Sequence, residues 1–545
     1  MSGIKKPSRT LVNIAGIVAV ATLISKIFGL VRQQAIAAAF GVGAAANAYS
    51  YAYILPGFLL VLLGGINGPF HSALVSVLAK REKEEAAPIV ETITTFVSGI
   101  LLLVTIVLII FADPLIDLVA PGLNQTQGVT AAQAQTLALT KAIAIQQLQI
   151  MAPMALFAGL IGIGFATLNS ADQYWLPSIS PLFSSITVIG GLAGLAIILG
   201  GKITTNEYAM LGGQVLAIGT LAGAILQWLV QIIAQWRSGL GTLRLRFDFH
   251  NTGVKEVLRI MAPATFSSGM LHINVYTDLF FASFIPKAAA SLSYAGLLVQ
   301  TPLGIISNVL LVPFLPIFSR LTDPQDWPEL KQRIRQALIL TALTMLPLGA
   351  IMVSLAMPIV QVVYQRGAFD KQASQLVASL LVVYGMGMFF YLGRDVLVRV
   401  FYALGDADTP FRISIFNIFL NALLDFIFIK PFGAPGLVLA TMGVNITSMI
   451  FLTWALHQKL NGLPMKEWSL KIGALAGASV FTGVISWGVS WGFQRFIPQQ
   501  NLLIQLLELT IATLVGLAVF AFFAIQLKLP EVNILASRIK QKLGR

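Results

Sequence analysis

The sequence predicts an all-α polytopic membrane protein, and two observations support this fold class. The first is composition: of 545 residues, 57% are hydrophobic and 10% are charged, and the mean hydropathy is +0.83. Soluble globular proteins of this length are far less apolar. The second is that apolar runs of about 20 residues, each long enough to cross a bilayer, recur along the whole chain. The longest polar stretch, around 237–255, is too short to bury a core of its own.

The apolar runs give the expected elements in chain order. They predict about fourteen transmembrane helices, centred near residues 24, 62, 101, 152, 188, 220, 270, 304, 343, 387, 419, 446, 481 and 514. Glycine and proline total 47 and 24 residues. Because both are frequent in these spans, we expect kinked helices that can rearrange during a transport cycle.

Two pairs of segments indicate an internal duplication. Residues 165–172 match residues 401–408 at four of eight positions. A looser pair joins residues 40–52, which end Tyr-Ser-Tyr-Ala, to residues 284–295, which end Leu-Ser-Tyr-Ala. Duplicated halves in a membrane protein favour a transporter, because a site between two similar halves can open to either side.

The distribution of Lys and Arg predicts the orientation. These residues crowd alternate loops, and the intervening loops hold roughly a third as many. The crowded segments are the N-terminus, residues 80–83, 237–259, 320–335 and 459–471, and the C-terminal tail. Both termini are therefore expected on the cytoplasmic side of a bacterial inner membrane. The net charge of +13 then reflects topology and attraction to anionic lipid, and it needs no nucleic-acid partner.

The side-chain inventory argues against an enzyme. Cysteine is absent, which excludes disulfides, thiolate chemistry and cysteine metal sites. The four histidines are scattered without ligand spacing, and the sequence contains no phosphate-binding loop and no nucleophile–base pair. We predict no catalytic residue and expect any work to be driven by a gradient rather than by ATP.

Basic residues inside the spans are candidate functional residues, because a charge in hydrocarbon is costly. Lys26 and Arg32 are six residues apart, so they lie roughly 120° apart around a helix and can edge one polar face. Arg394 and Arg399 lie toward the cytoplasmic end of the tenth span. The structural alternatives are snorkelling for Arg399 and an internal ion pair of Arg394 with Asp395 or a neighbour.

A second set of polar residues lies toward the outer ends of three spans. Asn421 and Asp425 are four residues apart and therefore share one helix face. Asp278 and Thr441 fall at a similar depth in their own spans, roughly 8–12 Å below the outer surface. Carboxylate, amide and hydroxyl oxygens suit a hard cation, so the set predicts a site for a monovalent cation or a proton. The alternative is that each group hydrogen-bonds a neighbouring helix separately.

Several segments resemble one known family. Residues 24–33 (ISKIFGLVRQ), 39–41 (AFG) and 53–56 (YILP) are similar to the N-terminal signature of the MurJ (MviN) lipid II flippases. These flippases belong to the multidrug/oligosaccharidyl-lipid/polysaccharide exporter superfamily. The resemblance covers essentially the whole chain, and it continues through residues 68–70, 401–406, 409–410 and 433–437.

The resemblance implies two pseudo-symmetric six-helix lobes around a central cavity, followed by two C-terminal helices. The implied boundaries are 1–236 for the N-lobe, 237–254 for a cytoplasmic linker, 255–462 for the C-lobe, 463–530 for helices lining a lipid groove and 531–545 for a basic tail. The implied activity is transfer of lipid II, a lipid-linked disaccharide-pentapeptide, from the cytoplasmic to the outer leaflet by alternating access. The main alternative is an exporter of another lipid-linked glycan or a small amphiphile; a scaffold or leak channel is the third hypothesis.

The family's charged cavity residues carry over unevenly. Arg32 matches a first-helix arginine of the family, and Lys26 keeps the charge of another. Other charged positions of the family are neutral in this chain, namely Gln33, Asn47, Leu297 and Gln300. Because paired cations suit a pyrophosphate head group, the predicted substrate-binding residues are Lys26, Arg32, Arg394 and Arg399.

The polar residues near the outer ends of the spans match the family's positions better than the basic residues do. Asp278, Asn421, Asp425 and Thr441 fall where similar proteins hold a sodium ion, and Leu437 is placed to offer its backbone carbonyl. The resemblance thus implies sodium as the coupling ion, which would favour one conformation through differential binding. We expect no other cofactor. The expected partners are the lipid-linked substrate and membrane lipids, with a monomeric protein and with cell-wall synthases as candidate protein partners.

Overall fold

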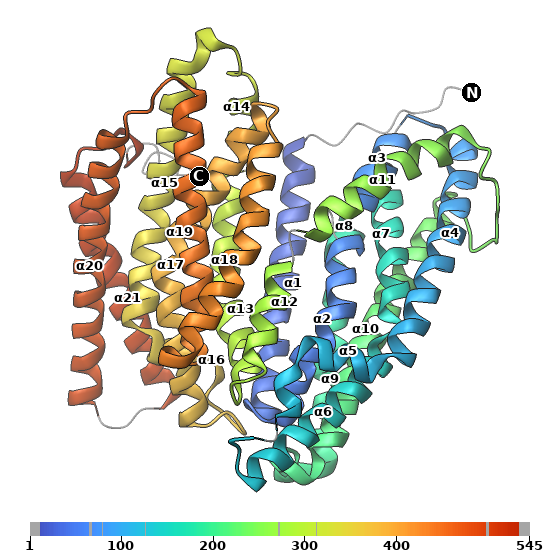
Figure 1. Ribbon diagram of the computed structural model, residues 1–545, viewed down its shortest axis with the longest axis horizontal. Helices are drawn as coiled ribbons and strands as arrows, with labels where there is room; N and C mark the ends of the chain where they lie inside the picture. Colours follow the sequence, from blue (N-terminus) through green and yellow to red (C-terminus); the bar gives the residue numbers. More distant parts are fainter. Residues whose placement is uncertain are drawn as a thin grey trace. The chain divides into compact units, whose positions relative to one another are not determined.

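The computed structural model describes residues 11–64, 68–78, 80–125, 127–270, 273–311, 313–497 and 501–532 (Figure 1). All regular secondary structure in these ranges is helical. The chain divides into two compact units. The first unit comprises Met1–Ala290 with Arg366–Phe369, and the second comprises Ser291–Gln365 with Asp370–Arg545.

The first unit is built on pairwise helix packing in which α7 contacts α2, α3, α4 and α10, while α9 packs between α1 and α10. Its elements are α1 (Leu11–Phe40), α2 (Ala44–Gly64), α3 (Pro69–Leu78), α4 (Lys83–Ile110), α5 (Ala112–Val119), η1 (Pro121–Asn124), α6 (Ala131–Met151), α7 (Met154–Ser170), α8 (Trp175–Ile179), α9 (Leu182–Leu199), η2 (Gly200–Thr204), η3 (Asn206–Tyr208), α10 (Ala209–Arg237), α11 (Thr252–Met270) and α12 (Ile273–Ala282).

The second unit is built around α17, which packs against α15 and α19; α18 covers α19, and the pair α20 and α21 packs against α15. Its elements are the greater part of α13 (Ala288–Leu310), then α14 (Phe314–Ser319), η4 (Pro324–Asp326), α15 (Trp327–Ser354), α16 (Ala356–Tyr364), α17 (Lys371–Ala403), α18 (Asp408–Phe432), α19 (Ala434–Lys459), α20 (Met465–Phe496) and α21 (Leu502–Gln526).

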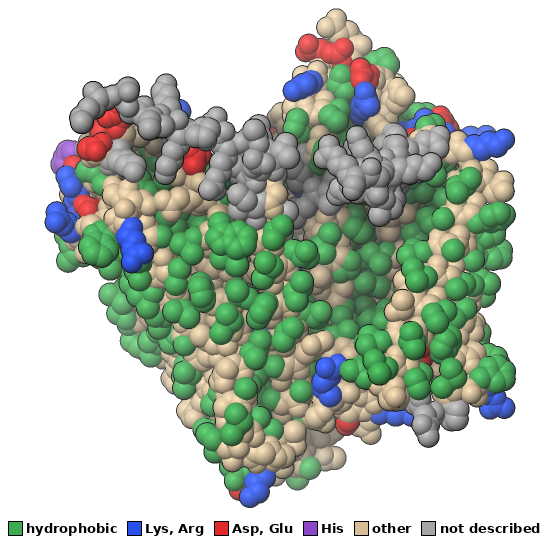
Figure 2. Space-filling model, turned by 180° about the vertical axis from the view of Figure 1, so that it is seen from behind, with side chains coloured by type: hydrophobic (Ala, Val, Ile, Leu, Met, Phe, Trp, Pro, Cys, Tyr) green, Lys and Arg blue, Asp and Glu red, His purple; other side chains and the backbone are tan. Residues whose placement is uncertain are grey.

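The helices are long and apolar enough for a multi-span membrane protein. Eleven of those described could cross a membrane singly, and the bent pair α6–α7 raises the number to twelve. The predicted count of fourteen is not confirmed, and the two additional spans expected near residues 24 and 270 are outside this set. In Figure 2, hydrophobic side chains cover the middle of the visible face, and most charged side chains lie toward its upper and lower margins. This pattern suits a surface that contacts lipid.

The span predicted near residue 152 is broken. Helices α6 and α7 are bent by 42° at their junction, where Pro153 precedes the first residue of α7. Proline has no N–H to donate to the preceding turn and its ring clashes with that turn, so the helix bends at this position.

The duplication is visible in matching helix boundaries. Helices α2 and α13 start at Ala44 and Ala288, and this spacing equals that between Phe40 and Phe284 in the repeated segments. The second repeat marks the ends of α7 and α17. After each helix one residue adopts a left-handed backbone, Asp172 (φ 58°) in one copy and Gly405 (φ 72°) in the other.

In both of these caps the next N–H donates to the carbonyl five residues earlier, at 2.9 Å. This is the hydrogen bond of a Schellman motif. When the two copies of the motif are aligned, Gly405 falls opposite Asn169, three residues before Asp172. Both copies therefore contain the same kind of helix end, and the end of α17 comes about one turn earlier in the motif.

Small residues let the helices approach closely. A Cβ atom at Gly162 of α7 would overlap the backbone carbonyl of Leu63 in α2, and one at Gly349 of α15 would overlap the carbonyl of Gly385 in α17. Helix contacts in membranes depend on such close packing, because lipid tails are as apolar as the side chains and provide no hydrophobic driving force.

Candidate functional site

The candidate site of the first unit centres on Arg32 in α1, which is half-buried. Its Nη1 donates a hydrogen bond to Ser184 Oγ of α9 at 3.3 Å. Its Nε is buried and has no hydrogen-bond acceptor among the described residues. Lys26, also half-buried, lies on the same helix and forms no ion pair with any part of the chain that the structure describes. These two cations therefore keep hydrogen-bonding capacity for an anionic group.

Tyr49 of α2 is a neighbour of Arg32 that the sequence did not identify as a site residue. Its hydroxyl pairs with Thr220 Oγ1 of α10 at 3.0 Å, its ring stacks on Tyr53 with centroids 5.4 Å apart, and it lies within electrostatic range of the Arg32 guanidinium. The available signal was the Tyr-Ser-Tyr of the repeated segment, which indicated a duplication but no role for its side chains.

Asn47, at the start of α2, has a structural role that requires a neutral amide. Its Nδ2 donates to the carbonyls of Val42 at 2.7 Å and Gly43 at 3.0 Å. Its Oδ1 accepts a hydrogen bond from the Ala290 N–H of α13 at 3.1 Å. A carboxylate could accept the third of these bonds but could not donate the first two.

In the second unit, the hydrogen-bond partner of Arg394 is on another helix. Its Nη1 donates to Asn445 Oδ1 of α19 at 3.2 Å, and Asn445 Nδ2 donates to the Thr441 carbonyl at 2.8 Å. The Arg394 Nε is buried without an acceptor in the described ranges. The alternative of an ion pair with adjacent Asp395 is wrong for the described chain, since no ion pair joins them. Successive helix residues do not face each other.

Arg399 is half-buried one helical turn after Asp395 on α17. Asp395 is also half-buried and lies within electrostatic range of both Arg394 and Arg399. This end of α17 therefore carries two cations and one acid in succession.

The structure brings together part of the predicted cation set. Asn421 and Asp425 are almost completely buried on α18, and Asn421 Nδ2 donates to Asp425 Oδ2 at 3.0 Å. On the adjacent helix α19, the Thr441 hydroxyl donates to the Leu437 carbonyl at 3.2 Å. The oxygen atoms of these four residues have the chemistry that suits a hard cation.

Asp278 belongs to the first unit, where it is half-buried on α12. The predicted layer of oxygen ligands is thus divided between the two units. The described residues contain no group of three or more His, Asp or Glu placed to hold a metal ion. A monovalent cation does not require such a group, because hydroxyl, amide and carbonyl oxygens can complete its coordination.

The described residues of the second unit line a small cavity and a larger, partly open one. A cavity of about 60 Å³ is lined by Thr441 and Asn445 of α19, together with Gln300 of α13 and Tyr384 and Tyr391 of α17. A larger apolar cavity of about 810 Å³ lies among α15, α16, α17 and α20, and its lining includes Met345, Met357, Met386, Phe389 and Trp487. Its volume and apolar lining suit a hydrocarbon chain.

A duplicated set of kinked apolar helices with half-buried cations is typical of one class, the polytopic membrane transporters. The model of the family described as "Lipid II flippase MurJ" matches residues 36–507. The chain belongs to this MurJ family.

Individual relatives of the chain are described as members of the same family. A "Probable lipid II flippase MurJ" from Synechocystis sp. is 59% identical over the full length of both chains. A protein of the same description from Vibrio cholerae is 28% identical, with 96% of this chain and 97% of that protein covered.

Two solved structures share the fold. One is described as "Lipid II flippase MurJ, inward closed conformation", with a TM-score of 0.71, 23% identity and coverage of 93% of this chain and 99% of that chain. The other is an inward-facing multidrug resistance MATE family transporter of the MOP superfamily, with a TM-score of 0.57, 14% identity and coverage of 85% and 98%. The fold class predicted from the sequence is confirmed.

Proposed function

We propose that the protein moves lipid II, the lipid-linked peptidoglycan precursor, from the cytoplasmic to the outer leaflet of a bacterial plasma membrane. The family match over residues 36–507 and the 59% identical relative support the substrate class. The geometric observation that carries the proposal is the half-buried Arg32, whose Nε lacks an acceptor in the described chain. As a member of a flippase family the protein is a transporter, and flipping breaks no covalent bond.

In this proposal the pyrophosphate is bound by cations and the lipid tail by an apolar surface. Lys26 and Arg32 are the head-group residues of the N-lobe, 1–236, and Arg394 and Arg399 are those of the C-lobe, 255–462. Guanidinium groups suit this role because their planar donors bind phosphate oxygens in pairs. The apolar cavity beside α20, within the C-terminal segment 463–530, would hold part of the polyprenyl chain.

The proposed coupling ion is sodium. Asp278, Asn421, Asp425, Thr441 and the carbonyl of Leu437 would hold it, and their oxygen-only donor set supports this assignment. A bound cation would supply differential binding energy that favours one conformation of an alternating-access cycle. The buried Asp425 carboxylate is the principal anionic donor on α18.

We further propose a monomeric inner-membrane protein with both termini in the cytoplasm. The Lys- and Arg-rich linker 237–254 and tail 531–545 would then lie on the cytoplasmic side. Cell-wall synthases, which consume the flipped precursor, are the candidate protein partners.

The test is complementation of a bacterium depleted of its own lipid II flippase. We expect growth with the wild-type chain and loss of growth with Arg32→Ala, because a half-buried cation of the head-group site is removed. Arg320→Ala, which removes an exposed arginine in a loop, is the matched control and should support growth. Membrane levels of all three proteins are measured by immunoblot.

Failure of a well-inserted wild-type chain would contradict the proposal. It would favour the second candidate, an exporter of another lipid-linked glycan or a small amphiphile. The observation behind this candidate is that Gln33, Asn47, Leu297 and Gln300 are neutral where the family resemblance predicts charge.

A further inference from the structure

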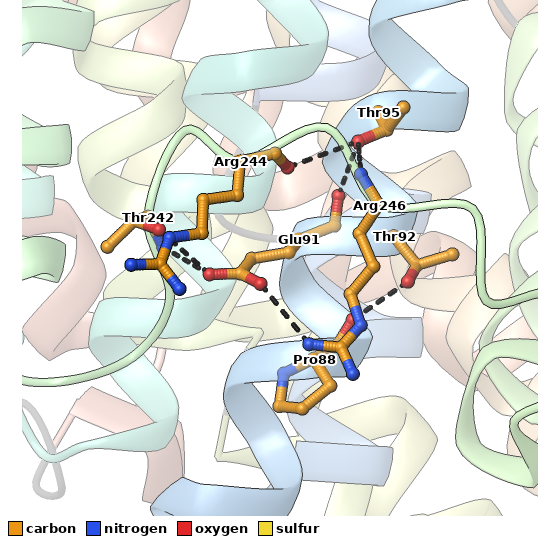
Figure 3. A network of polar contacts seen from close by, with 7 residues as sticks. All are labelled: Pro88, Glu91, Thr92, Thr95, Thr242, Arg244 and Arg246. Carbon is orange, nitrogen blue, oxygen red and sulfur yellow. Dashed lines mark hydrogen bonds and ion pairs between the residues drawn. The ribbon is translucent and has the colours of Figure 1, made fainter.

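The segment that joins α10 to α11 packs against the side of α4 and is hydrogen-bonded to it (Figure 3). Glu91 of α4 is only 7% exposed. Its Oε1 accepts hydrogen bonds from the Thr242 N–H at 3.0 Å and the Thr242 hydroxyl at 2.9 Å. Its Oε2 lies 3.6 Å from Arg246 Nη1. The buried Glu91 carboxylate thus binds two residues of the connecting segment, Thr242 and Arg246.

The next turn of α4 adds further contacts. Thr95 Oγ1 accepts a hydrogen bond from the Arg246 N–H at 3.1 Å. Phe249 packs edge-on against Phe96 of α4, with ring centroids 5.8 Å apart. Backbone and side-chain contacts together therefore give residues 242–249 a defined position on the helix, although they contain no helix or strand of their own.

These contacts place the segment beside a membrane-spanning helix rather than beyond its end. Helix α4 from Glu84 to Ile110 is a candidate membrane span. Crossing about 30 Å of hydrocarbon takes about 20 residues at about 1.5 Å each, so the hydrocarbon part counted back from Ile110 begins at about Glu91. Glu91 therefore lies near the boundary between lipid head groups and acyl chains, and Thr95 lies one turn further in.

The segment also carries three large apolar side chains that are exposed. Leu243, Leu245 and Phe247 are 58%, 82% and 68% exposed. They alternate with arginines, as expected when an extended chain presents successive side chains to opposite sides. Trp236, at the end of α10, is also exposed, and tryptophan favours the membrane–water interface. An ordered loop with so much exposed apolar surface is better matched to lipid than to water.

The same segment is basic. Residues 236–247 contain three arginines and no acidic residue, and Asp248 is the first acid after them. Arg246 is paired with Glu91. Arg237 and Arg244 are exposed and form no ion pair with any residue in the described ranges. Their charge complements the phosphate of an anionic lipid.

We propose that residues 236–247 form an interfacial lipid site. Leu243, Leu245 and Phe247 insert into the adjacent leaflet, and Arg237 and Arg244 bind the phosphate of an anionic glycerophospholipid. A lipid is favoured over a soluble protein partner because the segment lies beside an apolar span, where acyl chains are its lateral neighbours. The site is independent of the transported substrate.

Depth measurement by spin labelling tests the insertion. The chain has no native cysteine, so Leu245→Cys in the full-length protein gives a single labelling position, and Thr322→Cys in an exposed loop is the control. Both proteins are reconstituted into vesicles of phosphatidylcholine mixed with phosphatidylglycerol. We expect the label at 245 to collide readily with oxygen but weakly with a water-soluble nickel chelate, and the label at 322 to show the opposite. Equal access of the chelate to both positions would overturn the proposal and indicate a soluble partner.

Lipid retention tests the anionic site. Native mass spectrometry of the purified protein would compare bound phosphatidylglycerol in the wild type, in Arg237→Gln/Arg244→Gln and in Arg320→Gln. Each interfacial arginine is worth roughly fivefold in affinity for an anionic lipid, so the double variant should lose phosphatidylglycerol and the control should keep it. Unchanged retention in the double variant, or equal retention of phosphatidylcholine by the wild type, would overturn the site.

Discussion

At the scale of single residues, Asn47 shows how one amide can join two helices. It donates to the carbonyls of Val42 and Gly43 before α2 and accepts from the Ala290 N–H of α13. The side chain is buried. The Gly43 carbonyl also accepts from the Asn47 backbone N–H at 3.1 Å, so the Val42 carbonyl and the Ala290 N–H are the groups that depend most on the side chain. The sequence predicted a neutral side chain in a cavity, whereas the structure gives the amide a local structural role.

Replacing Asn47 by Asp should therefore destabilise the protein, although the two side chains have nearly the same shape. The carboxylate cannot donate, so the buried Val42 carbonyl loses its hydrogen bond and the Gly43 carbonyl keeps only the bond from the Asn47 backbone N–H. We expect a loss of about 2 kcal/mol. Thermal unfolding of the purified protein in detergent measures the effect. Asn206→Asp, at an exposed position, is the control, and an equal melting temperature for all three proteins would refute the assigned role.

Asp425 is the residue on which the proposed sodium site depends most. Replacing it by Asn removes the buried charge of α18 while keeping the side-chain volume. We expect sodium chloride, compared with potassium chloride, to raise the melting temperature of the wild type and of the exposed control Asp323→Asn, but not that of Asp425→Asn. The assignment fails if Asp425→Asn keeps the full sodium dependence.

At the scale of elements, breaks and close contacts decide how the helices are used. The run near residue 152 reads as one apolar span, but Pro153 divides it into α6 and α7 with a bend of 42°. Helix α7 then packs chiefly against α2, α3, α4 and α10. A glycine of α7 such as Gly162 leaves room for a neighbouring helix. On an exposed helix face, by contrast, no neighbouring atom prevents the addition of a methyl group.

A pair of Gly→Ala substitutions separates these two environments. At Gly162 of α7 the added Cβ would overlap the Leu63 carbonyl of α2, so Gly162→Ala should destabilise the protein by about 1–3 kcal/mol. At Gly190 of α9 the added Cβ meets no atom within 4 Å. Gly190→Ala should be neutral or stabilise by up to about 1 kcal/mol, because alanine is the better helix former. Chemical or thermal unfolding in detergent compares them, and equal effects would contradict the predicted close packing.

At the scale of the whole molecule, membrane orientation is the property that the charge pattern addresses most directly. Because the chain has no cysteine, single cysteines report on one position each. In intact cells a membrane-impermeant maleimide should label Lys202→Cys, in the connection between α9 and α10, and should leave Arg320→Cys unlabelled until the cells are opened. Labelling of Arg320→Cys alone in intact cells would reverse the proposed orientation.

The fold class, the family and the identities of the charged residues within the spans could be predicted from the sequence alone. Each of these depends on composition, hydropathy over about 20 residues or short motifs, which are local properties of the chain. The starts of α2 and α13 were also predictable, because the repeated segments mark both. For the same reason Asn421 and Asp425 could be paired on one helix face before their hydrogen bond was known.

The sequence did not predict which groups on different elements are in contact, because these contacts depend on how the helices pack. The partner of Arg394 is Asn445 on α19 rather than adjacent Asp395, and Glu91 is paired with a loop some 150 residues away in sequence. Hydropathy reports whether a residue enters the membrane but not which neighbour satisfies its polar atoms. That choice depends on helix rotation and packing distance, which small residues such as Gly162 set through contacts far apart in the chain.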